Sequence, residues 1–561
     1  MTADKRTLDA EAESEGKGLG DILDLDDAVL RAQGHEIKLE RSFSWMGALG
    51  LAFSIVNSWL TYASCFGVAY SYGSGPVAVF SPVVSALVQW IMLMGVAELS
   101  SAFPSSGGQY HFTYIVAPDR CKAFLAYMVG AINVIAWWVN TASGTIYTAI
   151  SAFGVCQFLT GGFQGTQWQV YLCYLLLILL TLVPIFIIPQ QRIENMTKTA
   201  MFLSMVGFVL VVIVCLVMGR GTYQPSRIME YRCTSGWNPG VGFLLGIGNG
   251  EYAFAAAGAC VHIAEEIPNP SRKVPLVINL TIALGAITLV PWIIAMTSVI
   301  HDIEAVQNSF LPSLELFHQA TGSKAAAAAL QIYLTILYYS KFFLDAYLFS
   351  LSPYINTPQA CVPSQWITSS RMTWAFSRDV SFSTIPTDDH SIMYSDSMAF
   401  IKNGLPFSNY WAEVDSERNI PIRATLLSAG FCTIYGLLYI ASTQAFNSII
   451  NTAVLMLNIT YTVPQAILIV RGRAMLPARH FNLRNYGYLV HVFSVLWLIL
   501  SAVLFFLPTS NPPTLANMNY NSVVIVGIYS IVLLCWIERR QKFCGPAIDW
   551  DILNAAEATS E

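Results

Sequence analysis

One carboxylate, Glu251, lies where ionisable groups are rare, within an apolar stretch long enough to cross a bilayer. A charge at membrane depth is costly, so such a residue is a candidate for binding a solute or an ion. Its surroundings, residues 246–275 (GIGNGEYAFAAAGACVHIAEEIPNPSRKVP), are unusually rich in glycine, at Gly246, Gly248, Gly250 and Gly258. Glycine lets the backbone leave helical geometry, which at this depth is tolerated only around a cavity or inside protein. This stretch therefore predicts a discontinuous helix that holds a small solute.

A second polar segment, AFSIVNSWLTYASC, lies within the first apolar stretch of the chain, over residues 52–65. Serine and threonine can bond back to their own helix, but the amide of Asn57 has several groups to satisfy. A break here would direct backbone N–H groups and the positive end of a helix toward an anionic solute group. Cavity lining and simple helix packing both remain open for the polar residues Ser54, Asn57, Ser58 and Thr61.

Two tryptophans and one further glutamate are also candidates. Trp137 and Trp138 lie near the middle of a long apolar segment, where they either wall a pocket or pack against other helices. Glu98 ends an apolar run, and a carboxylate at a helix C-terminus opposes the helix dipole. We therefore expect a basic partner for Glu98.

The end of the 246–275 stretch carries a charged cluster. His262 and Glu266 are four residues apart and share a helix face, while Glu265 and Glu266 place negative charge at a C-terminal end. Two interpretations remain open, a structural cap or a gate that opens as ion pairs break. The expected basic partners are Arg272, Lys273, Arg371 and Arg378.

The elements that must position these residues are membrane-spanning helices. Hydrophobic residues make up 55% of the 561-residue chain and charged residues only 11%, against about 25% in soluble domains. A water-soluble core cannot hide so much apolar surface, so the composition predicts a polytopic membrane protein. Windows of about 20 apolar residues span a bilayer. We find about twelve, at residues 46–70, 77–97, 123–153, 170–188, 200–218, 241–263, 276–300, 325–367, 422–442, 449–470, 489–507 and 522–536.

Loop charges predict the orientation of these spans. With the N-terminus in the cytosol, the inside loops hold 18 Lys and Arg residues and the outside loops 4. Both ends of the chain are therefore expected in the cytosol, with a disordered tail at 1–39, a transmembrane domain at 40–542 and a short tail at 543–561. The basic loop RGRAMLPARHFNLRN at 471–485 is interpreted as part of this topology signal.

Several motifs carry a specific resemblance. AELSSAFPSSGGQYHF follows the second predicted span and HIAEEIPNPSRKVP follows the sixth, while PSQWITSSRMTWAFSRD and GLPFSNYW come later. Together they resemble the amino acid–polyamine–organocation superfamily of transporters, and its fungal branch of amino-acid, GABA and choline permeases. The resemblance covers roughly residues 39–542. It implies an all-α fold of about twelve transmembrane helices, an inverted repeat of five plus five helices with discontinuous helices 1 and 6, and two extra helices.

The resemblance also implies where the solute binds. Its carboxylate or polar head would contact the backbone of the first break, and its amine would face the second break. Many relatives have an acidic residue four positions before the histidine of the sixth span, where this chain has Gly258; we hypothesise that Glu251 replaces it. The implied residues are Ser54, Ile55, Val56 and Asn57 at the first break and Tyr252, Phe254 and Gly258 at the second.

The leading interpretation is a permease for an amino acid or a GABA-like amine, coupled to protons and working by alternating access. No Walker motif or metal-ligand pattern occurs, so we expect neither an enzyme nor a cofactor. We expect a plasma-membrane location, with the bilayer and a small solute as partners and no nucleic acid. One alternative is a nutrient-sensing membrane receptor. Another is a choline permease, because a quaternary ammonium favours aromatic faces, here Trp59, Trp137, Trp138, Tyr252 and Phe254.

Two segments interrupt the resemblance. Residues 340–360 divide the predicted eighth span and place Lys341 and Asp345 at membrane depth. Residues 380–403 separate two motifs that are adjacent in the relatives. We interpret both segments either as retained introns or as lineage-specific loops, which a transcript read across the junctions would distinguish.

Overall fold

Long apolar helices make up almost all of the described molecule. The structure is a computed structural model that describes residues 30, 39, 41–161, 165–187, 190–339, 361–378, 404–415, 418, 420–442, 444–514, 518–541, 543 and 545. Within these residues there is no β-strand, and an isolated bridge joins Asp415 and Ile420. Helices suit a bilayer because they satisfy their own backbone hydrogen bonds where lipid offers no partners.

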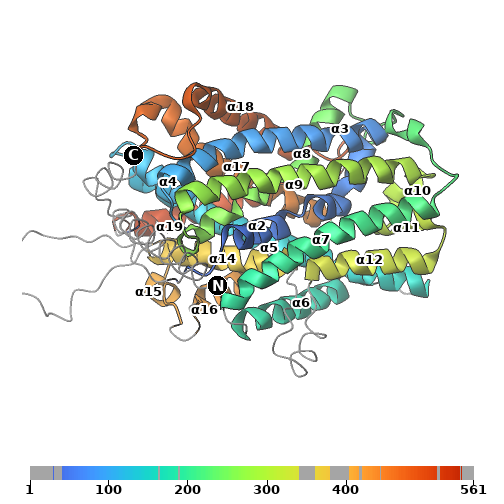
Figure 1. The fold of residues 1–561 in the computed structure, drawn as a ribbon, viewed down its shortest axis with the longest axis horizontal. Helices are drawn as coiled ribbons and strands as arrows, with labels where there is room; N and C mark the ends of the chain where they lie inside the picture. The colour runs from blue at the N-terminus through green and yellow to red at the C-terminus, as the bar shows by residue number, and fades with distance from the viewer. Residues whose placement is uncertain are drawn as a thin grey trace, which may run out of the picture.

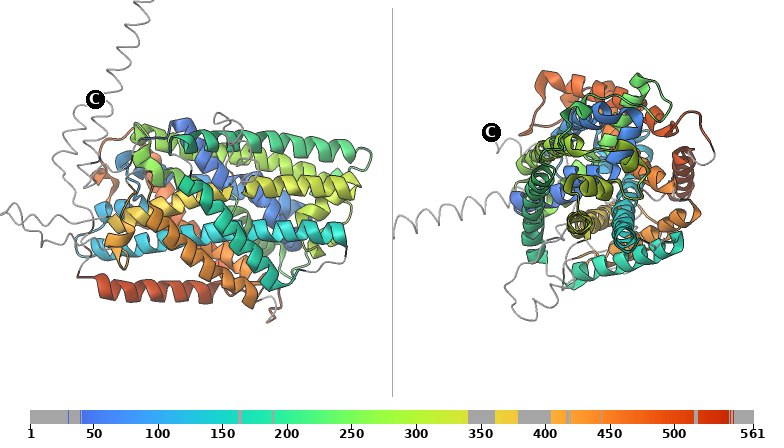
Figure 2. Two further views of the ribbon diagram at one scale, coloured as in Figure 1. Left: turned by 90° about the horizontal axis from the view of Figure 1, so that it is seen from below. Right: turned by 90° about the vertical axis from the view of Figure 1, so that its right-hand side faces the viewer.

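The longest helices run side by side along the long axis of the molecule (Figure 1), and a view along that axis shows them end-on as a bundle (Figure 2). In chain order the described elements are α2 (Trp45–Val56), α3 (Ser58–Ala102), α4 (Gln109–Val116), α5 (Lys122–Thr160), α6 (Gln167–Ile187), α7 (Gln190–Met218), η1 (Pro225–Ile228), α8 (Pro239–Glu251), η2 (Ala255–Glu266), α9 (Pro270–Val299), α10 (Ile303–Asn308), α11 (Pro312–Thr321), α12 (Lys324–Tyr339), α14 (Cys361–Arg378), α15 (Ser408–Trp411), α16 (Ile422–Ala441), α17 (Gln444–Arg471), η3 (Arg473–Met475), η4 (Arg484–Tyr486), α18 (Gly487–Phe506) and α19 (Asn521–Arg539).

These helices follow the predicted spans. Helix α3 joins the end of the first span to the second across a kink, with non-helical dihedral angles at Gly73 and Ser74. Among the described residues, eight segments are long and apolar enough to cross a membrane. The prediction of an all-α polytopic fold is confirmed, and the count of twelve spans remains a prediction.

The predicted eighth span consists of two described helices, α12 and α14, which both pack against α5. Residues 340–360, with Lys341 and Asp345, and residues 380–403 lie outside the described residues. Most of the predicted N-terminal tail and of the C-terminal tail lies outside them as well. At the end of the N-terminal tail, Leu39 is buried against Trp374 of α14 and Ala424 of α16.

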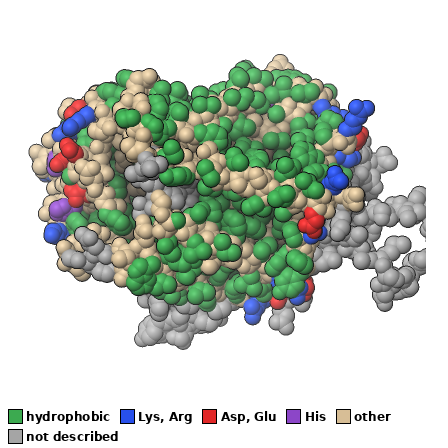
Figure 3. Space-filling view, turned by 180° about the vertical axis from the view of Figure 1, so that it is seen from behind, with side chains coloured by type: hydrophobic (Ala, Val, Ile, Leu, Met, Phe, Trp, Pro, Cys, Tyr) green, Lys and Arg blue, Asp and Glu red, His purple; other side chains and the backbone are tan. Residues whose placement is uncertain are grey.

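The surface of the bundle is apolar where lipid would contact it. In Figure 3, hydrophobic side chains cover the middle of the molecule, and charged side chains gather toward its two ends. Many large apolar side chains are more than 60% exposed, among them Leu179, Phe202, Val217, Ile434 and Leu496. A continuous apolar surface of this kind is stable in a bilayer and not in water. The chain is therefore an integral, multi-pass membrane protein.

Two helices are discontinuous at the places that the sequence predicts. Helix α2 ends and α3 begins at Asn57, whose φ of 31° and ψ of 60° are left-handed. Asparagine adopts this conformation more readily than most residues do. The second break separates α8 from η2 at Tyr252–Phe254, and η2 continues as a 3₁₀ helix rather than an α-helix. Both predicted breaks are confirmed.

Candidate solute-binding site

The first break leaves the N-terminus of α3 without a side-chain cap. Asn57 precedes α3 but makes no capping bond, so the N–H groups that start at Ser58 lack this partner. The carbonyl of Val56, at the end of α2, accepts a hydrogen bond of 2.7 Å from the Thr61 hydroxyl. Unpaired N–H groups and the helix dipole favour negative charge at such an end. This end of α3 therefore suits an anionic group.

Side chains of neighbouring helices hold the second break. Ser58 Oγ donates to the carbonyl of Ala253 at 2.8 Å, and Tyr461 Oη of α17 donates to the carbonyl of Ala255 at 2.9 Å. Carbonyl groups that the break releases thus find partners inside the protein. This pairing explains how unwound backbone is stable at membrane depth.

Five buried polar atoms near these breaks have no hydrogen-bond partner in the described part of the chain. They belong to α2, α5, η2 and α14; α14 packs against each of the other three, and α2 against η2. Buried polar groups are nearly always hydrogen-bonded, so a group of unpartnered atoms indicates a place for water or a ligand. We call the residues that carry these atoms the solute chamber: Ser54 (Oγ), Trp137 (Nε1), Asn140 (Nδ2), His262 (Nε2) and Gln365 (Oε1).

The chamber offers both donors and acceptors. His262 Nδ1 lies 3.1 Å from the carbonyl of Ser106, and because a carbonyl can only accept, Nδ1 carries the proton. In the neutral ring, Nε2 is then left as an acceptor. The Trp137 ring meets His262 edge-on, with 5.5 Å between ring centroids, and presents an indole N–H. Tyr252, from the second break, lies beside them, with its hydroxyl 3.0 Å from Ser143 Oγ of α5.

Other residues of the first break contribute to helix packing. The amide oxygen of Asn57 accepts a 2.8 Å hydrogen bond from Ser204 Oγ of α7, and Trp59 Nε1 donates to the same hydroxyl at 3.1 Å. Cavity lining and helix packing were the two alternatives for the Asn57 side chain. The structure shows that its amide oxygen takes part in helix packing. Ile55 and Val56 are buried at the end of α2.

Three candidates of the sixth span point to other helices. Phe254 is fully buried and packs beside α9. A Cβ atom at Gly258 would lie 3.0 Å from Tyr461 Oη, so α17 occupies the space beside this glycine. The structure does not bring Glu251 into the chamber. Its carboxylate accepts hydrogen bonds from α3, α17 and α18, through Gln89, Asn458 and Trp497.

The glutamates that end η2 pair with arginines of α14. Arg371 Nε donates to Glu266 Oε1 at 2.9 Å, and both side chains are fully buried. Arg378 Nη1 donates to Glu265 Oε2 at 2.6 Å, and its guanidinium lies 4.1 Å from the centroid of the Trp374 ring. Of the four expected basic partners, Arg371 and Arg378 of α14 therefore pair with the two glutamates. Both pairs tie the sixth span to α14 beside the chamber, and their opening as a gate remains a prediction.

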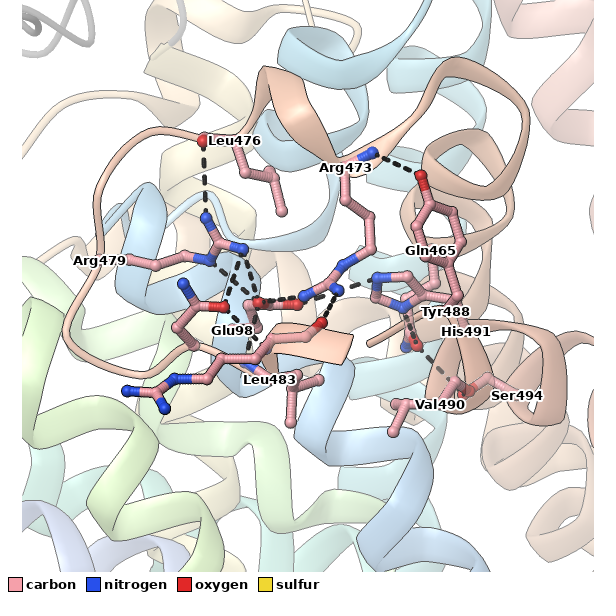
Figure 4. A network of polar contacts seen from close by, with 12 residues as sticks. Glu98, Gln465, Arg473, Leu476, Arg479, Leu483, Tyr488, Val490, His491 and Ser494 are labelled. Atoms are coloured by element: carbon pink, nitrogen blue, oxygen red, sulfur yellow. Dashed lines mark hydrogen bonds and ion pairs between the residues drawn. The ribbon is translucent and has the colours of Figure 1, made fainter. Parts of the chain in front are cut away.

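Glu98 has the basic partners that its position predicts (Figure 4). Its carboxylate accepts hydrogen bonds from Arg473 Nη2 at 2.5 Å, Arg479 Nη2 at 2.7 Å and the backbone N–H of Leu483 at 3.1 Å. The interpretation of loop 471–485 as a topology signal was incomplete. Two of its arginines neutralise a carboxylate buried near the end of α3, where an unpaired charge would be strongly destabilising.

Sequence reasoning did not select two residues of the chamber. Asn140 lies three residues after Trp137, so the two share a face of α5, and this spacing could have identified it. Gln365 follows residues 340–360, which divide its span and obscure the helical pattern. In the structure its Oε1 lies 2.6 Å from the position of a Cβ atom at Gly144, so the two residues are in close contact.

The fold defines a class of protein, a multi-pass carrier with two discontinuous helices in an apolar bundle. The family model for amino acid permeases matches residues 43–343 and 397–529, and the chain belongs to this family. The permease predicted from the sequence is thereby confirmed.

Individual relatives agree with this assignment. The chain is similar to the choline transporter of Saccharomyces cerevisiae, with 29% identity over 524 residues, which cover 92% of this chain and 85% of that protein. It is also similar to the amino-acid permease BAT1 homolog of Oryza sativa, with 25% identity over 97% of this chain and 98% of the relative. A solved structure of the manganese transporter of Eremococcus coleocola shares the fold, with a TM-score of 0.51 and 11% identity over 90% of this chain and 94% of that chain.

Proposed function

We propose that this permease carries an amino acid or a GABA-like amine by alternating access, with proton coupling. The observation that carries the proposal is the mixture of unpartnered donors and acceptors in the chamber. A zwitterion supplies an ammonium group for acceptors such as His262 Nε2 and a carboxylate for donors such as Trp137 Nε1. The uncapped N-terminus of α3 favours the same carboxylate.

Choline is a second candidate, and the choline transporter among the relatives favours it. A quaternary ammonium donates no hydrogen bond and is attracted to aromatic faces, which Trp137 and Tyr252 supply. The hydroxyl group of choline would then be the single donor that the solute offers to the acceptors of the chamber.

Competition for uptake separates the two candidates. In cells that lack their own permeases, radiolabelled GABA should accumulate when this chain is produced. An excess of unlabelled amino acids should reduce that uptake by more than tenfold, while choline should leave it nearly unchanged, because a methylated nitrogen cannot donate to the acceptors of the chamber. If choline alone is transported and competes, the amino-acid proposal is wrong and the second candidate replaces it.

We also propose that the chain lies in the plasma membrane with both ends in the cytosol. With this orientation the inside loops hold 18 Lys and Arg residues and the outside loops hold 4, which supports it. Fluorescent proteins fused to either end should outline the cell and resist protease added outside. Cleavage of either fusion in intact cells would contradict this orientation, and labelling of internal membranes would contradict the location.

A further inference from the structure

Outside the solute chamber, the structure contains a second buried polar site, centred on the carboxylate of Glu251. Asn458 Nδ2 of α17 and Gln89 Nε2 of α3 donate to Glu251 Oε2 at 2.6 and 3.0 Å. Trp497 Nε1 of α18 donates to Glu251 Oε1 at 2.8 Å. Helices α3, α17 and α18 carry none of the chamber residues. The two sites are linked through the sixth span, in which α8 carries Glu251 and η2 carries His262. Glu251, Gln89 and Asn458 are fully buried.

The groups around this carboxylate are uncharged. In the described part of the chain, Glu251 has no ion-pair partner, and its three donors are neutral N–H groups. Gln89 Nε2 also donates to Asn458 Oδ1 at 3.0 Å, while Gln89 Oε1 is buried without any partner. A buried carboxylate without a cation can be neutralised only by a proton or a bound cation. Of the two amide oxygens in this ring, that of Asn458 accepts from Gln89, and that of Gln89 has no donor among the described residues.

Two titratable side chains on the packed elements, Cys65 and Tyr72 of α3, line a pocket next to α8. Tyr461 of α17 donates to the carbonyl of Ala255, and Cys65 of α3 contacts the carbonyl of Asn249. Glu98 and His491 lie nearer the other end of α3 and α18, roughly 14 and 9 Å along their helices from Gln89 and Trp497. The remaining titratable or charged residues of α3, η2, α17 and α18 are Tyr62, Tyr70, Cys260, His262, Glu265, Glu266, Arg471 and Tyr488.

The pocket next to α8 lies one to two helical turns from this site, on the side away from the Glu98 network, and is not lined by Glu251 or by its three donors. Gly248 and Asn249, one turn or less before Glu251, line it together with Asn451 of α17 and Leu504 of α18. Asn451 and Leu504 are each seven residues, or two turns, from the residue of their helix that donates to Glu251. Seven residues return to the same helix face. The pocket and the carboxylate therefore lie along one seam between α8, α17 and α18.

We propose that Glu251 binds the coupling proton, at a site reached through this pocket and separate from the solute chamber. The inference rests on the proposed transport function and adds the residue and the route. A hydronium ion that entered through the pocket would give its proton to Glu251 Oε2 in place of the Gln89 Nε2–H bond, leaving water and a neutral carboxyl group. A half-turn of the Gln89 amide would then present its free oxygen to the new O–H. This turn removes the Gln89–Asn458 bond, so protonation would break a link between α3 and α17, while the link between α3 and α8 would remain with donor and acceptor reversed.

The test uses the full chain in proteoliposomes, with radiolabelled GABA or, if the competition assay selects it, choline. The wild type should accumulate the solute when the pH gradient is directed inward. Glu251→Gln keeps the shape and cannot bind the proton, so pH-driven accumulation should fall at least tenfold. Exchange of external for internal solute needs no net proton movement and should stay within threefold of the wild-type rate.

A second variant tests positioning. Trp497→Phe removes one N–H donor from the ionised carboxylate and retains an aromatic ring. The proton should then be held more tightly, so half-maximal accumulation should move to higher pH, with exchange retained. A merely structural role of the indole would lower both activities together without moving the pH profile.

Several outcomes would overturn the proposal. Accumulation by Glu251→Gln at the wild-type level would exclude Glu251 as the proton site. Loss of exchange together with accumulation, in correctly inserted protein, would assign Glu251 to structure or to solute binding. Accumulation driven by a sodium gradient and not by a pH gradient would indicate a bound cation instead. If the wild type neither exchanges nor accumulates any tested solute, the proposed function itself is wrong.

Discussion

Replacing Arg371 by methionine should destabilise the folded permease by about 3–5 kcal/mol, because it removes the buried guanidinium that pairs with the fully buried Glu266 carboxylate. The loss should appear as a lower melting temperature in detergent, followed by size-exclusion chromatography of a fluorescent fusion. The cost arises mainly from the buried carboxylate of Glu266, which loses this guanidinium, and not from lost packing. Arg371→Met combined with Glu266→Gln should therefore recover most of the stability.

The control is Arg423→Met, which removes an arginine whose pair with Glu413 is exposed, with side-chain exposures of 35% and 57%. Its effect should stay within about 1 kcal/mol, because water screens such a pair. Two outcomes would show that the buried pair does not hold α14 to the sixth span. One is an equal fall in melting temperature for Arg371→Met and Arg423→Met, and the other is a double variant as unstable as Arg371→Met.

Replacing Trp137 by phenylalanine should raise the KM for the solute by about 10- to 150-fold, with little change in the amount of folded protein. Among the described residues the indole N–H is buried without a partner, so its removal costs the empty permease no hydrogen bond there. The bound solute would lose a hydrogen bond to a charged group, and such bonds contribute about 1.5–3 kcal/mol. The measurement is the concentration dependence of initial uptake, normalised to protein at the membrane.

The neighbouring tryptophan provides a matched control. Trp138 Nε1 already donates to Thr373 Oγ1 of α14 at 2.9 Å, so Trp138→Phe removes a bond between helices and none to the solute. It should lower stability and leave KM within about threefold, since its N–H is not free to bind solute. An unchanged KM in Trp137→Phe would remove this residue from the chamber, and an equal rise in both variants would indicate a general loss of packing.

The sequence by itself determined the class of protein and the places where two helices break. Twelve apolar windows, the glycines between Gly246 and Gly258 and the polar run around Asn57 are local features. Their consequences depend only on a bilayer that offers no hydrogen bonds to exposed backbone. The carboxylates of Glu98, Glu265 and Glu266 at helix C-termini also predicted basic partners, because negative charge there opposes the helix dipole.

Only the tertiary structure decided which side chains meet. Glu251 is 162, 207 and 246 residues from its three donors, and Glu98 is 375 residues from Arg473. In a membrane protein the lipid-facing and the buried sides of a helix are both apolar, so hydropathy does not reveal how a helix is rotated. That rotation placed Glu251 against α3, α17 and α18 and away from the solute chamber. It also turned Asn57 and Trp59 toward α7, because packing among all the helices fixes the rotation of each one.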